Sequence, residues 1–309
     1  MFKIIFFVCL GIGIFILGLI ILTAALKSFS KNRIRNIIDN YTGNIYISLL
    51  IGFVLTVIIQ SSSMVTVISV SMADAGLLKL YNAAGIIMGA NIGTTIAVQL
   101  YAFDLFALTP YAVLLGSILH FQKSTRLKFL GDIILGFGII FAGLKIMDIA
   151  VEPLRKIDEI RGFMEMMANP IYGVLTGIII ALIMQSSTVG IAMLQVLATA
   201  KLLPVYNALF IIYGLNIGTC SEAFIMSFAT NKEGKKIAIF NILFNIIGTI
   251  LFIPMTKYYY YMLQYITPKS LSHQIANGHM FFNIISTIII IPIIKYIFRF
   301  IELLMGKDI

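Results

Sequence analysis

Residues 60–63 read Gln-Ser-Ser-Ser, and the tetrad returns 125 positions later as Gln-Ser-Ser-Thr at residues 185–188. A second motif, Gly-Ala-Asn-Ile-Gly-Thr at residues 89–94, returns at the same spacing as Gly-Leu-Asn-Ile-Gly-Thr at residues 214–219. Self-similarity at a fixed offset marks a chain that is built from two related halves. The two pairs of motifs therefore predict two structural repeats.

The same offset aligns residues 11–95 with residues 136–220 without a gap. The first of these segments begins inside an apolar N-terminal run, residues 1–25, which resembles a signal peptide in having one lysine before its apolar stretch. Three of its glycines have partners in the second copy, namely Gly11 with Gly136, Gly13 with Gly138 and Gly18 with Gly143. We therefore expect this run to be a retained part of the first repeat.

The composition indicates a membrane environment. Hydrophobic residues make up 60% of the chain and charged residues 11%, whereas soluble domains average about 25% charged residues. Apolar stretches of roughly 20 residues, the length of a membrane-crossing helix, recur along the sequence. We expect an all-α integral membrane protein with a single transmembrane domain over residues 1–309. The net charge of +9 comes from basic residues in short loops, which argues against nucleic-acid binding.

The apolar segments beside each tetrad are too short to cross a bilayer separately. We expect residues 45–73 and residues 170–199 each to form a re-entrant helical hairpin with the polar tetrad at its tip. Non-helical backbone at membrane depth is tolerated only where protein covers it or water reaches it. The glycines of both Asn-Ile-Gly-Thr motifs weaken a helix by about 1 kcal/mol each. Each repeat is therefore also expected to contain a broken transmembrane helix.

The order of the segments predicts that the two repeats are inverted. Repeat 1 is placed at about residues 4–121, repeat 2 at about 130–262 and a terminal helix at about 279–303. Three crossings, at residues 4–26, 82–103 and 106–121, separate the starts of the copies. An odd number of crossings gives inverted repeats related by a pseudo-two-fold axis in the membrane plane. The third crossing is short and contains Pro110, and the inversion depends on it.

The loops of one face carry about twice as many basic residues as those of the other. Under the positive-inside rule, this places the N-terminus outside and the C-terminus in the cytoplasm of a multi-pass protein. The richer face has Lys27, Lys31, Arg33, Arg35, Lys79, Lys123, Arg126, Lys128, Lys232, Lys235, Lys236, Arg299 and Lys307, and the poorer face has Lys3, Arg155, Lys156, Arg161, Lys201 and Lys269.

The motifs bring neutral amides and hydroxyls into apolar segments, and such groups both donate and accept hydrogen bonds. A broken helix also frees N–H groups that suit an anion and carbonyls that suit a cation. This chemistry suits an oxyanion that binds together with small hard cations. No arginine in these segments could neutralise the anion, so co-bound cations would have to do so. Each ligand would then strengthen the binding of the other.

The paired motifs, with Phe244-Asn245, Phe282-Asn283 and the nearby His279, resemble the type II sodium–phosphate cotransporter family in its bacterial form. The resemblance covers nearly the whole chain. It implies sodium-coupled symport of inorganic phosphate across the plasma membrane, without a cofactor and without enzymatic activity. Many bacterial members carry a C-terminal domain of the phosphate-regulator type, which this sequence is expected to lack.

The resemblance also implies the residues of the site. The phosphate site would be formed by Gln60, Ser61, Ser62, Ser63, Gln185, Ser186, Ser187 and Thr188. Sodium would be bound by Ser62, Ser63, Asn91, Thr94, Thr95, Ser187, Thr188, Asn216 and Thr219. Glu222 is added to the sodium ligands on its own chemistry, as an ionisable residue within a membrane span. Glu222 stands where the first copy has Ala97. Two roles are open for its carboxylate. It either binds a cation or carries a proton within the membrane, or it is a solvated group near a helix end.

Other interpretations stay open at this point. The same machinery could carry another oxyanion or use protons in place of sodium. A channel or a membrane sensor is disfavoured because inverted repeats with broken helices are typical of alternating access. A serine hydrolase is disfavoured because no segment pairs a serine with a histidine base at recognisable spacing. Stoichiometry, direction and oligomeric state do not follow from the sequence.

Overall fold

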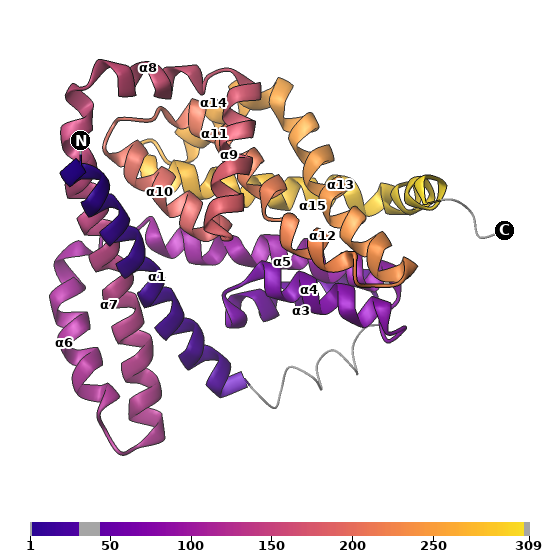
Figure 1. Ribbon diagram of the computed structural model, residues 1–309, viewed down its shortest axis with the longest axis horizontal. Coiled ribbons are helices and arrows are strands. Elements are labelled where there is room, and N and C mark those ends of the chain that lie inside the picture. Colours follow the sequence, from indigo (N-terminus) through magenta and orange to yellow (C-terminus); the bar gives the residue numbers. More distant parts are fainter. Residues whose placement is uncertain (1, 31–43, 306–309) are drawn as a thin grey trace.

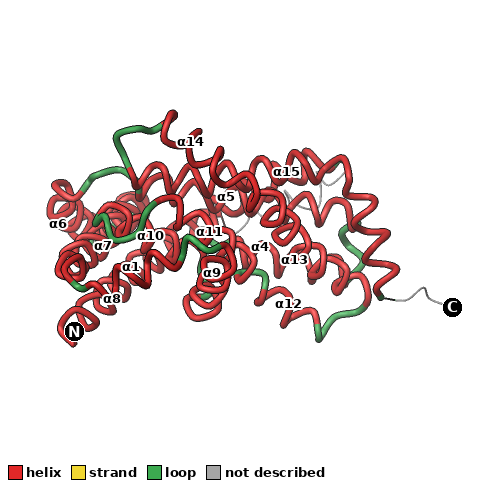
Figure 2. The backbone as a smooth tube through the Cα atoms, turned by 90° about the horizontal axis from the view of Figure 1, so that it is seen from above, coloured by secondary structure: helices red, strands yellow, loops and turns green. Residues whose placement is uncertain are grey.

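The computed structural model describes residues 2–30 and 44–305, and these residues form helices and connecting loops without a strand. Figure 2 shows this all-helical backbone. Within the described residues, six helices are long and apolar enough to cross a membrane. They are α1 (Phe2–Ser30), α5 (Leu80–Tyr101), α7 (Thr125–Val151), α11 (Val205–Gly218) with α12 (Ser221–Ser227), α13 (Lys232–Phe252) with α14 (Thr256–Ile266), and α15 (Leu271–Leu304). The expected all-α membrane architecture is confirmed.

Each tetrad lies at the tip of a helical hairpin, and the helices of the two hairpins begin and end at corresponding positions of the two copies. The first consists of α3 (Ile45–Ile59) and α4 (Ser62–Asp74), and the second of α9 (Pro170–Met184) and α10 (Ser187–Thr199). All four boundaries shift by 125 positions. Both hairpins also begin in the same way, because Asn44 and Asn169 each accept a hydrogen bond of 2.9 Å from a backbone N–H in the first turn. Such caps satisfy N–H groups that have no partner within the helix.

The expected helix break is present in the second copy only. There, α11 (Val205–Gly218) stops and α12 (Ser221–Ser227) begins after two residues, whereas α5 is continuous through Gly93 in the first copy. The prediction of a broken helix was therefore wrong for the first repeat. Gly93 is accommodated within the helix and serves close packing, since a Cβ on it would lie 2.7 Å from the Phe53 carbonyl oxygen. Gly218 has the same role against Ile178, so this glycine does not by itself decide whether the helix breaks.

Glycine contacts join each hairpin to the long helix that follows it. A Cβ on Gly52 would lie 1.9 Å from the Ile86 carbonyl oxygen, and one on Gly177 would lie 2.1 Å from that of Ile211. The backbones of α3 and α5, and those of α9 and α11, are therefore in direct contact. Inside lipid there is no hydrophobic force between helices, so close backbone packing through small residues holds such pairs together.

The first helices of the two copies, α1 and α7, pack against each other in opposite directions. A Cβ on Gly11 would lie 2.9 Å from the Gly143 carbonyl oxygen, and one on Gly18 would lie 2.8 Å from that of Gly136. Gly11 corresponds to Gly136 and Gly18 to Gly143, so interchanging the two copies turns one contact into the other. This is the relation expected about a local two-fold axis. Figure 1 shows α1 beside α7 on one side of the molecule, with α6 on the outer side of α7.

The connection between the copies is η1 (Phe106–Leu108) and α6 (Thr109–His120), which turns back along α7 so that Gly116 meets Leu135. Pro110 lies in the first turn of α6, where a missing N–H breaks no hydrogen bond. Residues 106–120 are apolar but shorter than the six candidate spans. The inversion of the two whole halves therefore stays a prediction.

The last long helix, α15, shows the relative directions of α5 and α11. Along α5, Tyr81 is in ring contact with Phe298 and Gln99 donates to Asn277, so α5 runs antiparallel to α15. Along α11, Leu209 lies near Gly278 and the ring of Tyr213 stacks on Phe282, so α11 runs parallel to α15. The counterpart helices α5 and α11 thus pass the same helix in opposite directions.

The remaining elements complete the second half of the chain. They are η2 (Glu152–Lys156), α8 (Asp158–Met166), α13 (Lys232–Phe252), η3 (Ile253–Met255) and α14 (Thr256–Ile266). Figure 1 shows α8 lying across one end of the molecule, and it meets α9 at 103°. Four of the basic residues counted for the orientation, Lys31, Arg33, Arg35 and Lys307, lie outside the described residues.

The glycine contacts predict a specific stability defect. Gly89→Ala places a methyl group 1.9 Å from the Leu49 carbonyl oxygen, whereas a Cβ on Gly13 meets nothing within 4 Å. We expect Gly89→Ala to destabilise the purified protein in detergent by about 1–3 kcal/mol or more, and Gly13→Ala to be neutral or slightly stabilising. Thermal unfolding measures both, and equal melting temperatures for the two variants would contradict this packing.

Candidate functional site

The two tetrads form the same turn in both hairpins. Gln60 and Gln185 have φ angles of 56° and 50°, in the left-handed region that non-glycine residues rarely occupy. Among the described residues, Lys201 is the only other non-glycine residue with a positive φ. Each glutamine ends one helix, and the next residue, Ser61 or Ser186, starts the other by accepting a backbone hydrogen bond. A strained conformation that appears twice at the same place suggests a function.

The turn places the remaining tetrad residues in the first turn of α4 and α10. At this position backbone N–H groups without helical partners point outward, which makes a helix start suitable for an anion. The hydroxyls of Ser62 and Ser63 are half-buried, whereas those of Ser187 and Thr188 are buried. Apart from the interaction of Ser63 with Glu222, the described hydrogen bonds of the tips stay within their own turns, such as that of 2.6 Å from the Gln60 amide to the Val57 carbonyl.

Each tip lies against the long helix of the other copy. The carboxyl group of Glu222, in the first turn of α12, interacts with the Ser63 side chain of the first tip. On the second tip, Val189 belongs to the same buried cluster as Ala97 of α5, the counterpart of Glu222. Further along α10, the Gln195 amide donates to the Val98 carbonyl at 3.0 Å. The structure therefore brings Ser63 together with Glu222 across the two copies.

The polar side chains of the Asn-Ile-Gly-Thr motifs mainly bond to their own helices. Asn91 and Asn216 both donate to the carbonyl four residues earlier, at 3.0 and 2.9 Å. The hydroxyls also donate within their helices, Thr94 to Ala90, Thr95 to Ile92 and Thr219 to Asn216. Each hydroxyl oxygen still has lone pairs for a cation. The described contacts do not join these side chains to the tetrads.

Asn216 connects three helices. Its side-chain oxygen lies 3.3 Å from His279 Nε2 on α15, and its backbone carbonyl accepts from Cys220 Sγ. Cys220 in turn accepts a hydrogen bond of 3.2 Å from the Asn245 amide on α13. His279 and Cys220 are both almost fully buried. The second motif is thus the meeting point of α11, α13 and α15.

The Phe-Asn pairs at residues 244–245 and 282–283 carry buried oxygens that sequence reasoning did not assign to the site. Asn245 and Asn283 each donate through Nδ2 to the carbonyl four residues earlier, at 3.0 and 2.9 Å. Their Oδ1 atoms are buried and have no hydrogen-bond partner. Leaving a buried acceptor unpaired costs about 1–3 kcal/mol, so these oxygens are available to accept from a water or to bind a ligand. The only sequence signal was the repetition of Phe-Asn itself.

Other buried hydroxyls lack partners in the same way. Those on the helices that carry the Phe-Asn pairs belong to Thr249, Ser286 and Thr287. Within the described residues, no group of three His, Cys, Asp or Glu side chains could hold a metal ion. A cation in this region would therefore be coordinated mainly by neutral oxygens, with Glu222 as a nearby carboxylate.

Comparison with known proteins identifies relatives of this chain. A family model described as Na+/Pi-cotransporter matches residues 14–149 and 155–267. The Escherichia coli protein named "Putative inorganic phosphate export protein YjbB" is 25% identical over 76% of this chain, and "Uncharacterized protein YqeW" of Bacillus subtilis is 28% identical over 78%. The match covers 44% of YjbB and 78% of YqeW, so the chain spans less than half the length of the first relative.

A shorter match reaches mammals. "Sodium-dependent phosphate transport protein 2A" of Oryctolagus cuniculus is 52% identical over 48 residues, which is 16% of this chain and 8% of that protein. No solved structure gives a significant match.

The left-handed glutamines predict an unusual order of stabilities. Glycine adopts this conformation without strain, whereas a β-branched residue does so at a cost of about 1–2 kcal/mol. We expect the melting temperature of the Gln60→Gly variant to equal or exceed that of the unchanged protein, and that of the Gln60→Val variant to be lower. The same pair of substitutions at Gln185 is the matched control. A glycine variant as unstable as the valine variant would contradict the described turn.

Proposed function

The chain belongs to the Na+/Pi-cotransporter family, and on this premise we propose that it carries inorganic phosphate across the plasma membrane together with sodium, by alternating access. The observation that carries the proposal is the contact between Ser63 at the first tip and Glu222 of the other copy. It joins an oxyanion-binding type of helix start to a carboxylate that suits a cation. The second tip has an apolar equivalent at Ala97.

Phosphate is assigned to the two tips. The turns at Gln60 and Gln185 expose N–H groups of α4 and α10, and the hydroxyls beside them can donate to phosphate oxygens. Neither tetrad contains a basic residue. A phosphate held there needs its charge balanced by cations, because an unpaired charge within the membrane is costly.

Sodium is assigned to the oxygens around the second motif and the Phe-Asn pairs. Asn245 and Asn283 present buried amide oxygens without partners, and Glu222 adds a negative charge beside the first tip. The sites expected for sodium at Asn91, Thr94, Thr95, Asn216 and Thr219 remain part of this proposal. Bound sodium would strengthen the binding of phosphate, and bound phosphate would strengthen the binding of sodium. Symport requires this coupling.

Alternating access would follow from motion of one part of the chain against another around the tips. The opposite directions of α5 and α11 along α15 support an arrangement of inverted repeats, in which such motion is largely a rocking of one repeat against the other. We place the N-terminus outside and the C-terminus in the cytoplasm, because the basic loops favour that orientation.

The energetics favour uptake. One net positive charge that moves inward gains about 2.3 kcal/mol per 100 mV, and a tenfold sodium gradient adds about 1.4 kcal/mol per ion. The name of YjbB refers to export of inorganic phosphate, so the test must allow movement in either direction.

The test is uptake of labelled phosphate into proteoliposomes with and without an inward sodium gradient. We expect sodium-dependent accumulation that saturates and supports exchange with internal phosphate. Gln60→Gly and Gln185→Gly keep the turn but remove the amide, and each should lower uptake about tenfold or more, equivalent to about 1.4 kcal/mol. Gln122→Gly changes an exposed glutamine outside the tips and should have no effect.

Non-saturating flux without exchange would instead indicate a channel. Full uptake in both tip variants would remove the tetrads from the phosphate site.

Glu222→Gln tests sodium against protons as the coupling ion. The substitution keeps the shape of the side chain and a hydrogen-bonding group toward Ser63, but it removes the charge. We expect the sodium concentration for half-maximal uptake to rise about tenfold, while a pH gradient alone drives no accumulation in either protein. Accumulation driven by a pH gradient in the unchanged protein, and lost in Glu222→Gln, would establish proton coupling instead.

A further inference from the structure

The two copies are hydrogen-bonded to each other at one end of the molecule. The carboxylate of Asp74, the last residue of α4, accepts a hydrogen bond of 2.5 Å from the backbone N–H of Asn231. The backbone carbonyl of Asp74 accepts a second one, also of 2.5 Å, from the Asn231 amide. Asn231 lies between α12 and α13 and caps α13 with its side-chain oxygen. The end of the first hairpin is therefore fixed to the start of a long helix of the second copy.

The offset of 125 residues identifies the equivalent positions at the opposite end. It relates Asp74 to Thr199, the last residue of α10, and Asn231 to Phe106, the first residue of η1. The last turns of α5 and α12 have a backbone hydrogen bond at equivalent positions, so the alignment extends past the repeated motifs. Thr199 and Phe106 supply neither a carboxylate nor an amide. The pair of hydrogen bonds is thus a feature of one end only.

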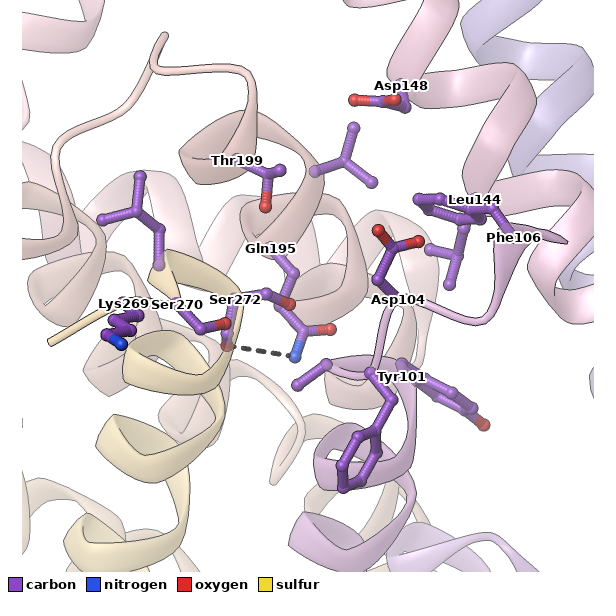
Figure 3. A pocket seen from close by; sticks show the side chains of 14 residues that line it. Tyr101, Asp104, Phe106, Leu144, Asp148, Gln195, Thr199, Lys269, Ser270 and Ser272 are labelled. Carbon is purple, nitrogen blue, oxygen red and sulfur yellow. Dashed lines mark hydrogen bonds between the residues drawn. The ribbon is translucent and has the colours of Figure 1, made fainter. Parts of the chain in front are cut away.

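At the opposite end, a cavity of about 320 Å³ lies between the two copies. Thr199 and Phe106 both line it, together with the ends of α5 and α7 and the start of α15. Figure 3 shows Thr199 and Phe106 on different sides of this cavity. One end of the interface between the copies is therefore closed by hydrogen bonds, and the other end is open at the equivalent positions.

The copies remain in contact on the inner side of the cavity. The Gln195 amide of α10 donates to the Val98 carbonyl of α5 at 3.0 Å, and both residues are almost fully buried. At the closed end the equivalent residues are the apolar Val70 and Ala223. There the hydrogen bonds lie at the rim instead, because Asn231 is exposed. A deep contact at one end and a rim contact at the other are expected when one copy is tilted against the other.

We propose that Asp74 and Asn231 form a gate contact that keeps one entrance between the copies closed, and that the cavity is the open entrance at the other end. The inference rests on the proposed alternating access and adds to it the residues that hold one side closed. In the other state the two hydrogen bonds break, and Thr199 approaches Phe106 as the cavity closes. Water can reach the gate contact at the rim, so its opening leaves no buried polar group unpaired.

The orientation proposed above decides which entrance is closed. The basic residues that follow Asn231 belong to the face placed in the cytoplasm, and Lys269, which lines the cavity, belongs to the face placed outside. The described state is then closed toward the cytoplasm and open toward the outside.

The test measures how fast a charged maleimide labels one cysteine at each end of the full chain, purified in detergent and choline buffer. The chain's own cysteines, Cys9 and Cys220, are replaced by serine and threonine. Thr199→Cys reports on the open end, since Thr199 is exposed in the cavity. Ser227→Cys reports on the closed end, since Ser227 is buried and corresponds to Ala102 of the cavity lining.

The gate variant combines Asp74→Ala, which removes the carboxylate, with Asn231→Ser, which removes the amide donor but keeps an oxygen that can cap α13. We expect it to label about tenfold faster at Ser227→Cys and more slowly at Thr199→Cys, because the cavity closes as the gate opens. Asp74→Asn alone keeps an acceptor for the Asn231 N–H, so it should leave both rates close to those of the unchanged gate.

Glu233→Gln is the matched control, because it weakens the ion pair with Lys236 inside α13 and leaves the gate contact in place. Both rates should stay the same in it. Thermal unfolding checks that the gate variant is folded, and if it is not, Asp74→Ala alone should give the same two changes to a smaller extent.

Unchanged labelling of Ser227→Cys in the gate variant would overturn the proposal. Faster labelling there without slower labelling of Thr199→Cys would also overturn it, since that result indicates local loosening at one end. The experiment uses neither phosphate nor sodium. Opposite changes at the two ends in a protein that takes up no phosphate would therefore support the gate and refute only the proposed substrate.

Discussion

The fold depends on one constraint, which is that interrupted backbone inside an apolar layer must be covered by protein. Each hairpin is interrupted at its tip, where Gln60 or Gln185 leaves the helical conformation. The N–H groups at these turns cannot be left facing lipid. The cover comes from the other copy, as the interaction of Ser63 with Glu222 and the shared buried cluster of Val189 and Ala97 indicate. A single copy would expose its own tip, so the duplication is a structural requirement.

The same constraint explains the many glycines. The long helices can cover the hairpins only if the backbones approach closely, and Gly52, Gly89, Gly177 and Gly214 allow this approach in both copies. With the helices packed in this way, the tetrad side chains are the polar groups at the two hairpin tips. Because these groups are neutral, a bound oxyanion needs cations beside it, and the unpaired oxygens of Asn245 and Asn283 are suitable ligands for them. In this account, packing and coupling arise from the same duplicated framework.

Much of the fold could be predicted from the sequence because the repeat is regular. Both hairpins follow from short apolar segments around a polar tetrad, and their boundaries agree with a shift of 125 residues. The continuous α5 could not be predicted, since Gly93 and Gly218 share their sequence context and their packing role, against Phe53 and Ile178, and yet only the second helix breaks. The left-handed glutamines were also hidden, because this conformation in a non-glycine residue is imposed by tertiary structure.

The central claim is that a tip of one copy and the long helix of the other form one site. Cysteine cross-linking tests it most directly, with Ser63→Cys and Glu222→Cys in a chain whose own cysteines, Cys9 and Cys220, are replaced by serine and threonine. In membranes the pair should form a disulfide under mild oxidation, and phosphate and sodium added together should slow its formation more than either alone. A double variant that forms no disulfide, although it is folded and each cysteine can be labelled, would contradict the account.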